Sequence, residues 1–347
     1  MNINSAEHSP LASGTALVTG GAGFLGSHVA EGLLAAGLDV VVLDDLSGGY
    51  QENVPNLAKL VVGSILDRDL LARTFDESSF DYVFHFAAYA AECLSHHIRN
   101  FNYLHNVVGT SNLITESSRR RVKAFVFASS AAVYGTAETS VSEDTVPQPE
   151  DPYGIAKYAM ELDLRAAHRV FGLPYVIFRL HNVYGERQDL TDRYRNVVGI
   201  HMRQALLGQA MTLFGAGDQT RQFTYVGDIT PHITRSIYLE AAMGQTFNIG
   251  ASSALSVIEI AQMVAESVGV ACNVHHEPPR IETHDVHVDH SKAQRVFGPM
   301  IETPTQLGIA RMTRWARENV RKARPFRPVE IEDHLPPVWR AGSPTEP

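Results

Sequence analysis

The 347-residue chain has little cysteine: Cys93 and Cys272 are its only two, and they lie far apart. This excludes a disulfide scaffold and is typical of a reducing compartment, so we expect a cytoplasmic protein. No run reaches the roughly 18 to 20 apolar residues that a membrane span needs. Residues 1–13 also lack the basic start and the apolar stretch of a signal peptide. Neither membrane insertion nor secretion is therefore expected.

The chain also lacks a concentrated block of positive charge. It contains 29 Lys and Arg residues against 38 Asp and Glu residues, for a formal net charge of -9, and the two signs are interspersed. Nucleic acid and anionic lipid are bound by clustered basic residues, so neither is an expected partner. The 16 histidines show no spacing that would fix several of them as ligands of one ion. We therefore predict no metal site.

What the chain does have is a 44% apolar fraction, which is enough for a large buried core. In its first half, short apolar runs alternate with segments of helical periodicity. The runs are residues 15–18, 39–43, 60–62, 82–86, 124–128 and 175–179, and the main helical segments are 99–116 and 153–171. Continuous apolar runs of this length are typical of parallel strands covered on both faces. The alternation predicts an α/β fold built on a doubly wound parallel sheet of the Rossmann type.

The second half is less regular, and this change predicts two domains. We assign residues 14–181 to the Rossmann domain, to which the chain returns around 222–250. Residues 182–221 and 251–320 are expected to form a smaller, mixed substrate-binding domain, with helices at 198–207 and 257–268. Residues 1–13 and 325–347 are rich in Pro or in charged and polar residues, so we expect flexible tails at both ends.

A glycine-rich turn joins the first predicted strand to the first predicted helix. Gly20, Gly23 and Gly26 follow the order G-x-x-G-x-x-G, in which small residues let the backbone turn tightly and let a pyrophosphate approach the helix N-terminus. Asp44 ends the second predicted strand, where its carboxylate can accept both hydroxyls of a ribose. The same carboxylate repels the extra phosphate of NADP, and no Arg lies within residues 44–49. The pattern predicts a dinucleotide site that prefers NAD.

Three polar residues form a second pattern. Tyr153 and Lys157 are four residues apart at the start of a predicted helix, which places both side chains on one face. A free tyrosine has a pKa of about 10, so a nearby ammonium, aided by the positive nicotinamide ring of the cofactor, is needed to make a phenolate available near neutrality. Ser130 lies just past a predicted parallel strand, at the sheet edge where sites of this architecture form. We interpret Tyr153 as a catalytic base, Lys157 as the group that lowers its pKa and Ser130 as a hydroxyl that binds the reacting oxygen.

With these residues in place, the chain resembles the extended short-chain dehydrogenase/reductases, in the group of NAD-dependent nucleotide-sugar epimerases and dehydratases. The resemblance runs from residue 15 to about residue 318 and rests also on residues 44–47, 85–88, 106–110, 182–185, 214–217 and 220–226. Besides the residues above, it implies a further set of cofactor contacts: Phe24, Leu25, Asp45, Leu46, Ser47, Ser64, Ile65, Phe86, Ala87, Ala88, Asn106 and His181. For a nucleotide-sugar substrate it implies Ser130, Asn182, Val197, Phe214, Arg221 and Arg280.

Two of these positions depart from the family pattern. Ser64 stands where many relatives have an Asp near the adenine, so a backbone amide or the Ser64 hydroxyl would have to replace that contact. His181 occupies a place where an aromatic ring often approaches the nicotinamide. It is interpreted either as a ring that tunes the cofactor or as a packed imidazole.

The resemblance also implies the reaction, in which hydride leaves a sugar carbon, usually C4, and a 4-keto intermediate forms. Similar 4,6-dehydratases carry an Asp-Glu pair directly after the serine position, where this chain has Ala131 and Ala132. Return of hydride to the opposite face is then the simplest outcome, and it predicts a nucleotide-sugar 4-epimerase with tightly held NAD. A 4,6-dehydratase or keto-sugar reductase is the alternative on the same site, and a non-catalytic dinucleotide-sensing regulator is the alternative of another class. By analogy with similar enzymes, we expect a homodimer that pairs helices 99–116 and 153–171.

Overall fold

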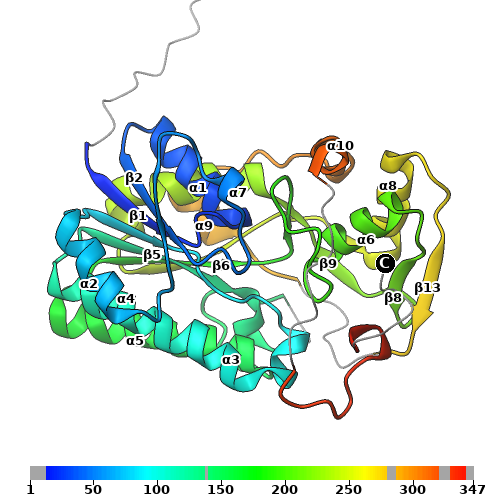
Figure 1. Cartoon of the computed structure of the whole chain (residues 1–347), viewed down its shortest axis with the longest axis horizontal. Helices are drawn as coiled ribbons and strands as arrows, with labels where there is room; N and C mark the ends of the chain where they lie inside the picture. Colours follow the sequence, from blue (N-terminus) through cyan, green and yellow to red (C-terminus); the bar gives the residue numbers. More distant parts are fainter. Residues whose placement is uncertain (1–12, 137–139, 280–286, 320–328, 341–347) are drawn as a thin grey trace, which may run out of the picture.

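The computed structural model describes residues 13–136, 140–279, 287–319 and 329–340. Residues 1–12 and the predicted substrate residue Arg280 lie outside these ranges. The described chain consists of a large parallel sheet flanked by helices, with a smaller group of helices and short strands beside it (Figure 1). No helix of the described residues is long and apolar enough to cross a membrane.

Seven strands form the main sheet, and every pairing in it is parallel. Their order across the sheet is β11-β6-β5-β4-β1-β2-β3. The bounds are β1 Thr15–Thr19, β2 Asp39–Asp44, β3 Lys59–Val62, β4 Tyr82–His85, β5 Ala124–Ser130, β6 Tyr175–Leu180 and β11 Gln245–Ile249. From β1 the chain first adds β2 and β3 on one side and then β4, β5 and β6 on the other, so the strand order reverses between β1 and β4. A doubly wound sheet opens a crevice at this point, at the carboxyl ends of its strands. The predicted α/β fold with a doubly wound sheet is confirmed.

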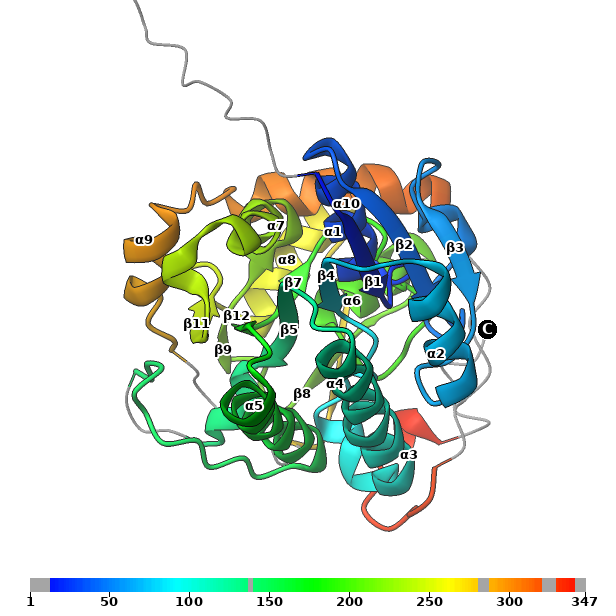
Figure 2. The same ribbon diagram turned by 90° about the vertical axis from the view of Figure 1, so that its left-hand side faces the viewer.

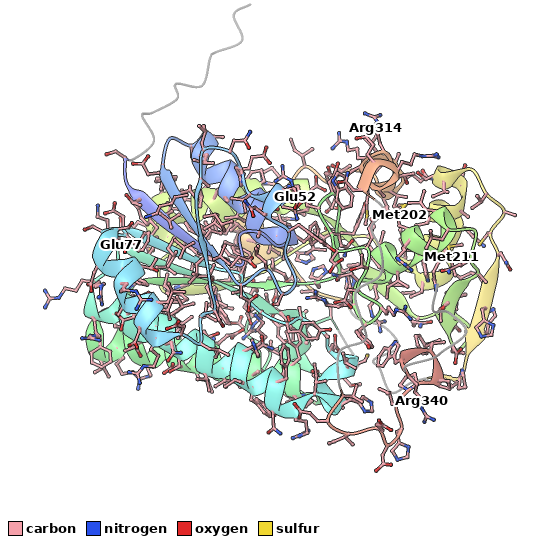
Figure 3. All side chains as sticks on the ribbon, viewed as in Figure 1. Glu52, Glu77, Met202, Met211, Arg314 and Arg340 are labelled. Carbon is pink, nitrogen blue, oxygen red and sulfur yellow. The ribbon has the colours of Figure 1, made fainter. Side chains whose placement is uncertain are left out.

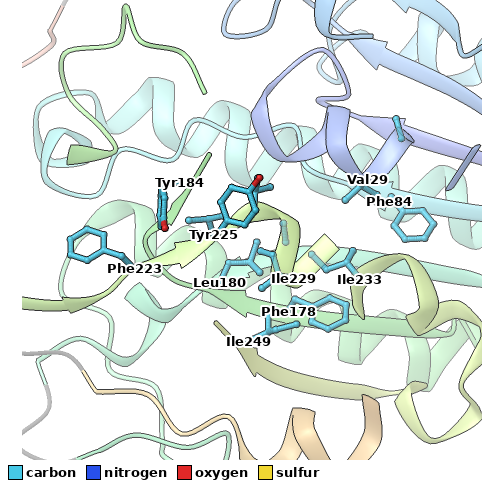
Figure 4. Close-up of a cluster of buried hydrophobic side chains, with 14 of the residues drawn as sticks. Val29, Phe84, Phe178, Leu180, Tyr184, Phe223, Tyr225, Ile229, Ile233 and Ile249 are labelled. Atoms are coloured by element: carbon cyan, nitrogen blue, oxygen red, sulfur yellow. The ribbon is translucent and has the colours of Figure 1, made fainter. Parts of the chain in front are cut away.

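The apolar runs form strands because both of their faces are buried. Along β1, Ala16 and Val18 belong to one buried cluster and Leu17 to another on the opposite face of the sheet. Figure 4 shows part of the first cluster, in which Phe178 of β6 lies near Ile233 of helix α7. Burying one such side chain contributes about 1.5–3 kcal/mol. The sheet is therefore stabilised from both sides along most of its length.

Helices cover the two faces of this sheet. One layer contains α2 (Arg68–Glu77), α3 (Arg99–Tyr103), α4 (Gly109–Arg119) and α5 (Pro152–Phe171). The other contains α1 (Phe24–Ala35), α7 (Val226–Arg235) and α9 (Ser291–Phe297) (Figures 1 and 2). Helix α7 packs on α1 although the two lie far apart in the sequence.

The two long predicted helices differ in their regularity. A π-helical turn, Leu104–Val108, interrupts the helix predicted for residues 99–116, which therefore consists of α3, this turn and α4. A π turn takes in one residue more than an α turn, and helical periodicity does not reveal it. Helix α5 keeps its predicted length because the Asp151 side chain caps its start and Gly172, with a φ of +73°, ends it.

The smaller part packs three helices together: α6 (Val197–Leu206), α8 (Val257–Val268) and α10 (Thr305–Asn319). Three two-stranded sheets complete it: β7 (Val183–Tyr184) with β10 (Thr224–Tyr225), β8 (Met211–Phe214) with β13 (Val274–Glu277), and β9 (Thr220–Gln222) with β12 (Ala254–Ser256). Figure 3 shows Met202 and Met211 in this part, on the opposite side of the molecule from Glu77 of α2. Between β10 and β12 the chain returns to the main sheet through β11.

Residues 329–340 correct the prediction of a flexible tail from residue 325 onward. They cross the lower edge of the molecule in Figure 1 and include a short 3-10 turn, Pro337–Trp339. Leu335 and Trp339 are each 4% exposed and belong to an apolar cluster with Tyr89. The composition argument failed here because it counts Pro and charge, whereas a few spaced apolar side chains are enough to dock a segment on a distant cluster.

Candidate active site

One large cavity opens at the carboxyl edge of the main sheet, beside the point where the strand order reverses. Its volume is about 510 Å³. The ends of the central strands and the start of α1 and α5 form one wall, and the loop before α6, α6 itself and β8 form the other. The predicted site residues in these walls are Gly20, Gly23, Phe24, Leu25, Gly26, Asp44, Asp45, Ser47, Ser64, Ile65, Phe86, Ala87, Ala88, Ser130, Tyr153, Lys157, His181, Asn182, Val197, Phe214 and Arg221.

The glycine-rich turn is tight because two of its glycines leave no room for a side chain. A Cβ on Gly26 would lie 2.2 Å from the Gly20 carbonyl oxygen, and one on Gly20 would lie 2.6 Å from the backbone nitrogen of Ala87. Gly20 also has a φ of +72°, which favours glycine. Helix α1 starts directly after Gly23 without a side-chain cap, so the N–H groups of its first turn are available to an anion. The turn fits the pyrophosphate of a dinucleotide.

Asp44 supports this turn from the end of β2. Its Oδ2 accepts from Ala22 N at 3.0 Å and its Oδ1 accepts from Leu46 N at 2.8 Å. Burial raises the pKa of the Asp44 carboxyl, and these two hydrogen bonds oppose the rise. Each oxygen keeps a second lone pair, so the carboxylate can still accept the hydroxyls of a ribose. The Leu46 side chain lies outside the cavity wall, and the residue acts through its backbone N–H.

Asn106 also lies behind the cavity wall, which corrects its prediction as a direct cofactor contact. Its Oδ1 accepts from Tyr89 N at 3.0 Å, and its Nδ2 donates to Tyr89 O at 3.2 Å and to Asn102 Oδ1 at 2.7 Å. The amide is therefore used by the protein itself. Because Tyr89 lines the cavity, Asn106 serves the site by holding the segment that follows β4.

Ser130, Tyr153 and Lys157 come together in the cavity. Strand β5 ends at Ser130, whose Oγ accepts from Ala132 N at 3.1 Å. Helix α5 begins next to it because Asp151 Oδ1 accepts from Tyr153 N at 2.9 Å and caps the helix. Lys157 follows Tyr153 by about one helical turn, and its Nζ lies 5.7 Å from the centre of the Tyr153 ring. The four-residue spacing thus brings the ammonium and the phenol together, as the sequence predicts.

The acid–base balance of this pair depends on more than the ammonium. Burial raises the pKa of Tyr153, and the Ser130 hydroxyl and the Arg195 guanidinium oppose the rise. Burial also lowers the pKa of Lys157 to about 7, while Nζ donates to Ala128 O at 2.7 Å. The ammonium alone therefore does not make the phenolate available near neutrality. A further positive charge next to the phenol is required.

A buried ion pair lies behind Lys157. Glu161 is 0% exposed and accepts from two nitrogens of Arg179, at 2.9 and 2.6 Å, and from Ser129 Oγ at 2.6 Å. Its negative charge favours the protonated form of Lys157. Because Ser129 directly precedes Ser130, one carboxylate both fixes the end of β5 and supports the charge of the lysine.

His181 lines the cavity and is held by a second histidine. Its Nδ1 lies 3.0 Å from Gln222 O, and its Nε2 lies 2.7 Å from Nε2 of His290. Burial lowers the pKa of His181 to about 3 and that of His290 to about 4, so both rings are neutral near pH 7. A carbonyl only accepts, so Nδ1 of His181 carries its single proton and His290 donates to Nε2. His181 is therefore a packed imidazole that also forms part of the cavity wall.

Among the residues that the structure describes, four arginines line the cavity wall contributed by the smaller part, and the sequence pattern singles out only Arg221 among them. Arg195 pairs with Asp192 at 2.5 Å. Arg203 is 9% exposed, and its Nε has no hydrogen-bond partner among the described residues. Burial lowers the pKa of Arg203, and the nearby charge of Arg193 lowers it further. A buried cation without a partner is costly, so this wall suits an anionic ligand.

Sequence reasoning missed Arg193, Arg195, Arg203 and Trp339 as cavity residues. The arginines lie in a loop and a helix that carry no recognisable pattern, and Trp339 lies in a segment with the composition of a tail. One signal was present: residues 187–203 contain four Arg and no Lys in an otherwise acidic protein, a local positive density that indicates an anion site.

Comparison with known proteins identifies the family of the chain. The profile of a family described as NAD dependent epimerase/dehydratase matches residues 16–250, which is more than half of the chain. The chain belongs to this family. This epimerase/dehydratase is 33% identical over 308 residues to a putative UDP-glucose 4-epimerase of Methanocaldococcus jannaschii, an alignment that covers 88% of this chain and 99% of the relative. The predicted family and its NAD dependence are confirmed.

Solved structures agree with this family membership. The UDP-glucose 4-epimerase of Thermotoga maritima with UDP-glucose superposes with a TM-score of 0.83 at 32% identity, covering 88% of this chain and 99% of its own. The UDP-glucose 4-epimerase of Thermus thermophilus in complex with NAD superposes with a TM-score of 0.82 at 32% identity, covering 88% of this chain and 100% of its own. The family fold therefore accounts for most of the molecule, and this chain is longer than either of these relatives.

Proposed function

We propose that the chain is an NAD-dependent 4-epimerase of a nucleotide sugar. The observation that carries the proposal is the meeting of Ser130, Tyr153 and Lys157 in one cavity, with Ala131 and Ala132 directly after the serine. The phenol can take a hydroxyl proton, and the two alanines provide no acid or base for elimination. Relatives named as UDP-glucose 4-epimerases support the same reaction.

The sheet side of the cavity fits NAD. The glycine-rich turn, residues 20–26, would hold the pyrophosphate, and Asp44 would accept the ribose hydroxyls. When bound, NAD accepts and returns a hydride, and its oxidised ring adds the positive charge that Tyr153 lacks in the chain alone. Residues 86–88 and His181 complete this wall.

The residues of the chain then carry the proton. Ser130 Oγ donates to the oxygen at C4 of the sugar and holds it against Tyr153. The Tyr153 phenolate takes the hydroxyl proton as C4 becomes a ketone, and it returns the proton when the alcohol re-forms with the opposite configuration. Lys157 stabilises the phenolate by its charge, and Glu161 favours the charged form of the lysine.

The arginine wall would receive the diphosphate of the substrate. Guanidinium groups bind phosphate oxygens through two parallel N–H donors, and Arg203 and Arg221 lie in the wall with Asn182. Val197 and Phe214 add apolar surface next to them. Binding of the diphosphate would relieve the repulsion between Arg193 and Arg203, so substrate and wall are matched in charge.

A 4,6-dehydratase is the second candidate, because the cavity wall contains a carboxyl group, that of Glu92, whose charge acts on the catalytic phenol. Glu92 lines the cavity, and its charge contributes to raising the pKa of Tyr153. A carboxyl group in the same cavity could act on a carbon next to the ketone. The choice between the two reactions therefore depends on whether Glu92 reaches the substrate.

Turnover in deuterium oxide tests the proposed reaction. The protein is incubated with UDP-, dTDP- and GDP-sugars, and the products are read by NMR and mass spectrometry. We expect a new stereoisomer of unchanged mass with no deuterium on carbon. Loss of water with deuterium in a methyl group would instead identify a dehydratase, and stoichiometric consumption of NADH a reductase. NAD binding without turnover of any sugar would favour the dinucleotide-sensing regulator.

We also propose that the enzyme is a homodimer joined through α4, α5 and the π turn between α3 and α4. Large apolar side chains are exposed on this layer: Leu104 by 46%, Val108 by 46%, Ile155 by 40% and Leu162 by 46%. The π turn packs beside α5, and Ile155 and Leu162 are seven residues apart on one helix face. Exposed apolar groups that gather in this way are typical of association surfaces.

Sedimentation velocity tests the dimer. The wild type is expected to sediment as a dimer and Leu162→Arg as a monomer, because a buried arginine without a partner opposes association. Leu307→Arg is the matched control, since Leu307 is exposed to a similar degree, 47%, on α10. A monomeric wild type at micromolar concentration would contradict the proposal.

A further inference from the structure

Residues 329–340, called the C-terminal segment below, are tied at their start to the sheet part of the molecule. Glu330 N donates to His97 O at 2.7 Å. The Glu330 carboxylate accepts from the backbone nitrogens of Asn100 and Phe101, at 2.8 and 2.9 Å, in the first turn of α3. A carboxylate in this position is favoured because it satisfies free N–H groups of the helix. The start of the segment is therefore firmly attached.

The end of the C-terminal segment reaches the smaller part. The Trp339 ring packs edge-on against Tyr194, with centroids 5.6 Å apart, and at 65° against Phe214 at the end of β8, with centroids 6.1 Å apart. Figure 3 shows Arg340, the last residue of the segment, on the same side of the molecule as Met211 of β8. The segment thus connects α3 of the sheet part to β8 of the smaller part, one on each side of the cavity.

Trp339 is also part of the cavity wall, together with Val338 and Phe214. The cavity therefore carries three chemically different linings: the catalytic residues, the arginines and these apolar and aromatic side chains. A nucleotide sugar likewise has three parts, which are the sugar, the diphosphate and the base. Among these parts only the base is aromatic, and aromatic rings also pack edge to face. Trp339 is 4% exposed, so only a small part of its ring is open to such a contact.

We propose that the nucleobase of the substrate packs against the part of the Trp339 ring that reaches the cavity, so that the C-terminal segment is a fixed component of the nucleotide site. This inference rests on the proposed function, because it takes a nucleoside diphosphate as the ligand. The segment lies beyond residues 16–250, which the family profile matches. This aromatic contact is therefore supplied from outside the part of the chain by which the family is recognised.

Tryptophan fluorescence gives a direct test, because Trp315 and Trp339 are the only two tryptophans. Trp315 lies on α10, outside the wall of this cavity, so Trp315→Phe leaves Trp339 as the only reporter. The variant, loaded with NAD, is titrated with UDP, dTDP and GDP. We expect the emission of Trp339 to change and saturate with the nucleotide that binds, and to stay constant with inorganic pyrophosphate, which lacks a base.

Affinity measurements complete the test. We expect Trp339→Ala to weaken binding of the nucleotide that binds the wild type by up to about tenfold, because the aromatic contact to the base is lost, and to leave NAD affinity unchanged. Trp339→Phe keeps a ring and is expected to stay within about threefold of the wild type. Calorimetry provides the affinities, and thermal melting with NAD verifies that each variant is folded.

The outcomes separate the two proposals. If none of the three nucleotides binds the NAD-loaded wild type, the proposed function fails and this inference with it. If a nucleotide binds the wild type and Trp339→Ala equally well and leaves the Trp339 emission unchanged, only the role of Trp339 is overturned. The fluorescence arm decides the question even if Trp339→Ala does not fold, because Trp315→Phe leaves the C-terminal segment intact.

Discussion

Removing the hydroxyl oxygen of Tyr153 should separate cofactor binding from turnover. We expect Tyr153→Phe to bind NAD normally and to lose turnover by a factor of about 10² to 10⁴, because the proton acceptor is gone while the ring still fills its buried place. Tyr158→Phe is the matched control on the same helix, outside the cavity wall. The readouts are steady-state kinetics and NAD binding by calorimetry. Turnover near the wild-type rate would rule out Tyr153 as the base.

The side chain of Arg203 is expected to oppose folding slightly while it helps binding. We expect Arg203→Gln to raise the KM for the nucleotide sugar about tenfold, in line with the loss of a charged hydrogen bond. Stability to urea should stay equal or rise, because the repulsion with Arg193 disappears. Arg314→Gln, on the exposed face of α10 (Figure 3), is the control and should change neither quantity. An unchanged KM would exclude Arg203 from the substrate site.

The Glu161–Arg179 ion pair joins helix α5 to strand β6. We expect Glu161→Met to cost about 3–5 kcal/mol in the free energy of unfolding, because it leaves the Arg179 charge buried without its partner. The double variant Glu161→Met, Arg179→Met should regain most of this loss, since it removes both charges. Urea unfolding measures the three values. Equal losses in the single and double variants would show that the charge balance is not the cause.

The main sheet was predictable because each of its first six strands is an apolar run bounded by polar residues. Burial of both faces turns such a run into a strand, and β2 (Asp39–Asp44) shows this with five consecutive buried residues. The smaller part was not predictable in the same way. Strands such as β7 and β10 have two residues each and depend on pairing with distant segments, which leaves no periodicity in the sequence. The proposed division into two domains stays a prediction.

The candidate site was predictable where its chemistry needs a local pattern. The glycine turn and the pair Tyr153 and Lys157 each act within a few residues, so their spacing is visible in the sequence. Arg203 and Trp339 serve the cavity only because α6 and the C-terminal segment are brought beside the sheet by tertiary packing. Asn106 shows the converse case, since a family-like residue lies near the site and acts through the backbone of Tyr89.

Buried histidines should make the free energy of unfolding of the whole protein fall in acid. Burial lowers the pKa of His85 and His181 to about 3 and that of His201 and His290 to about 4, against an ordinary value of 6.5. The unfolded chain therefore binds these protons more readily than the folded one. Their contribution to stability is complete above pH 6.5 and is lost as the pH falls toward 4, by at most about 1.4 kcal/mol per pH unit for each ring.

Urea unfolding between pH 7.5 and pH 4 measures this effect. We expect the midpoint to fall steadily below pH 6.5, and the slope to flatten in His201→Asn, which removes one of the four rings. His275→Asn is the matched control, because His275 is exposed on β13. A midpoint that stays constant from pH 7 to pH 5 would show that these rings do not couple folding to protons.

The position of β11 has a consequence for how the protein is made in a cell. This strand, Gln245–Ile249, completes a sheet whose other six strands all end before residue 181. A ribosome delivers residues in order, so the sheet remains one strand short, with β6 as an open edge, until residue 249 has left the exit tunnel. Open edges invite pairing with other chains. Synthesis that stalls before residue 245 would therefore release an aggregation-prone product, and the first 181 residues expressed alone should need a chaperone to stay in solution.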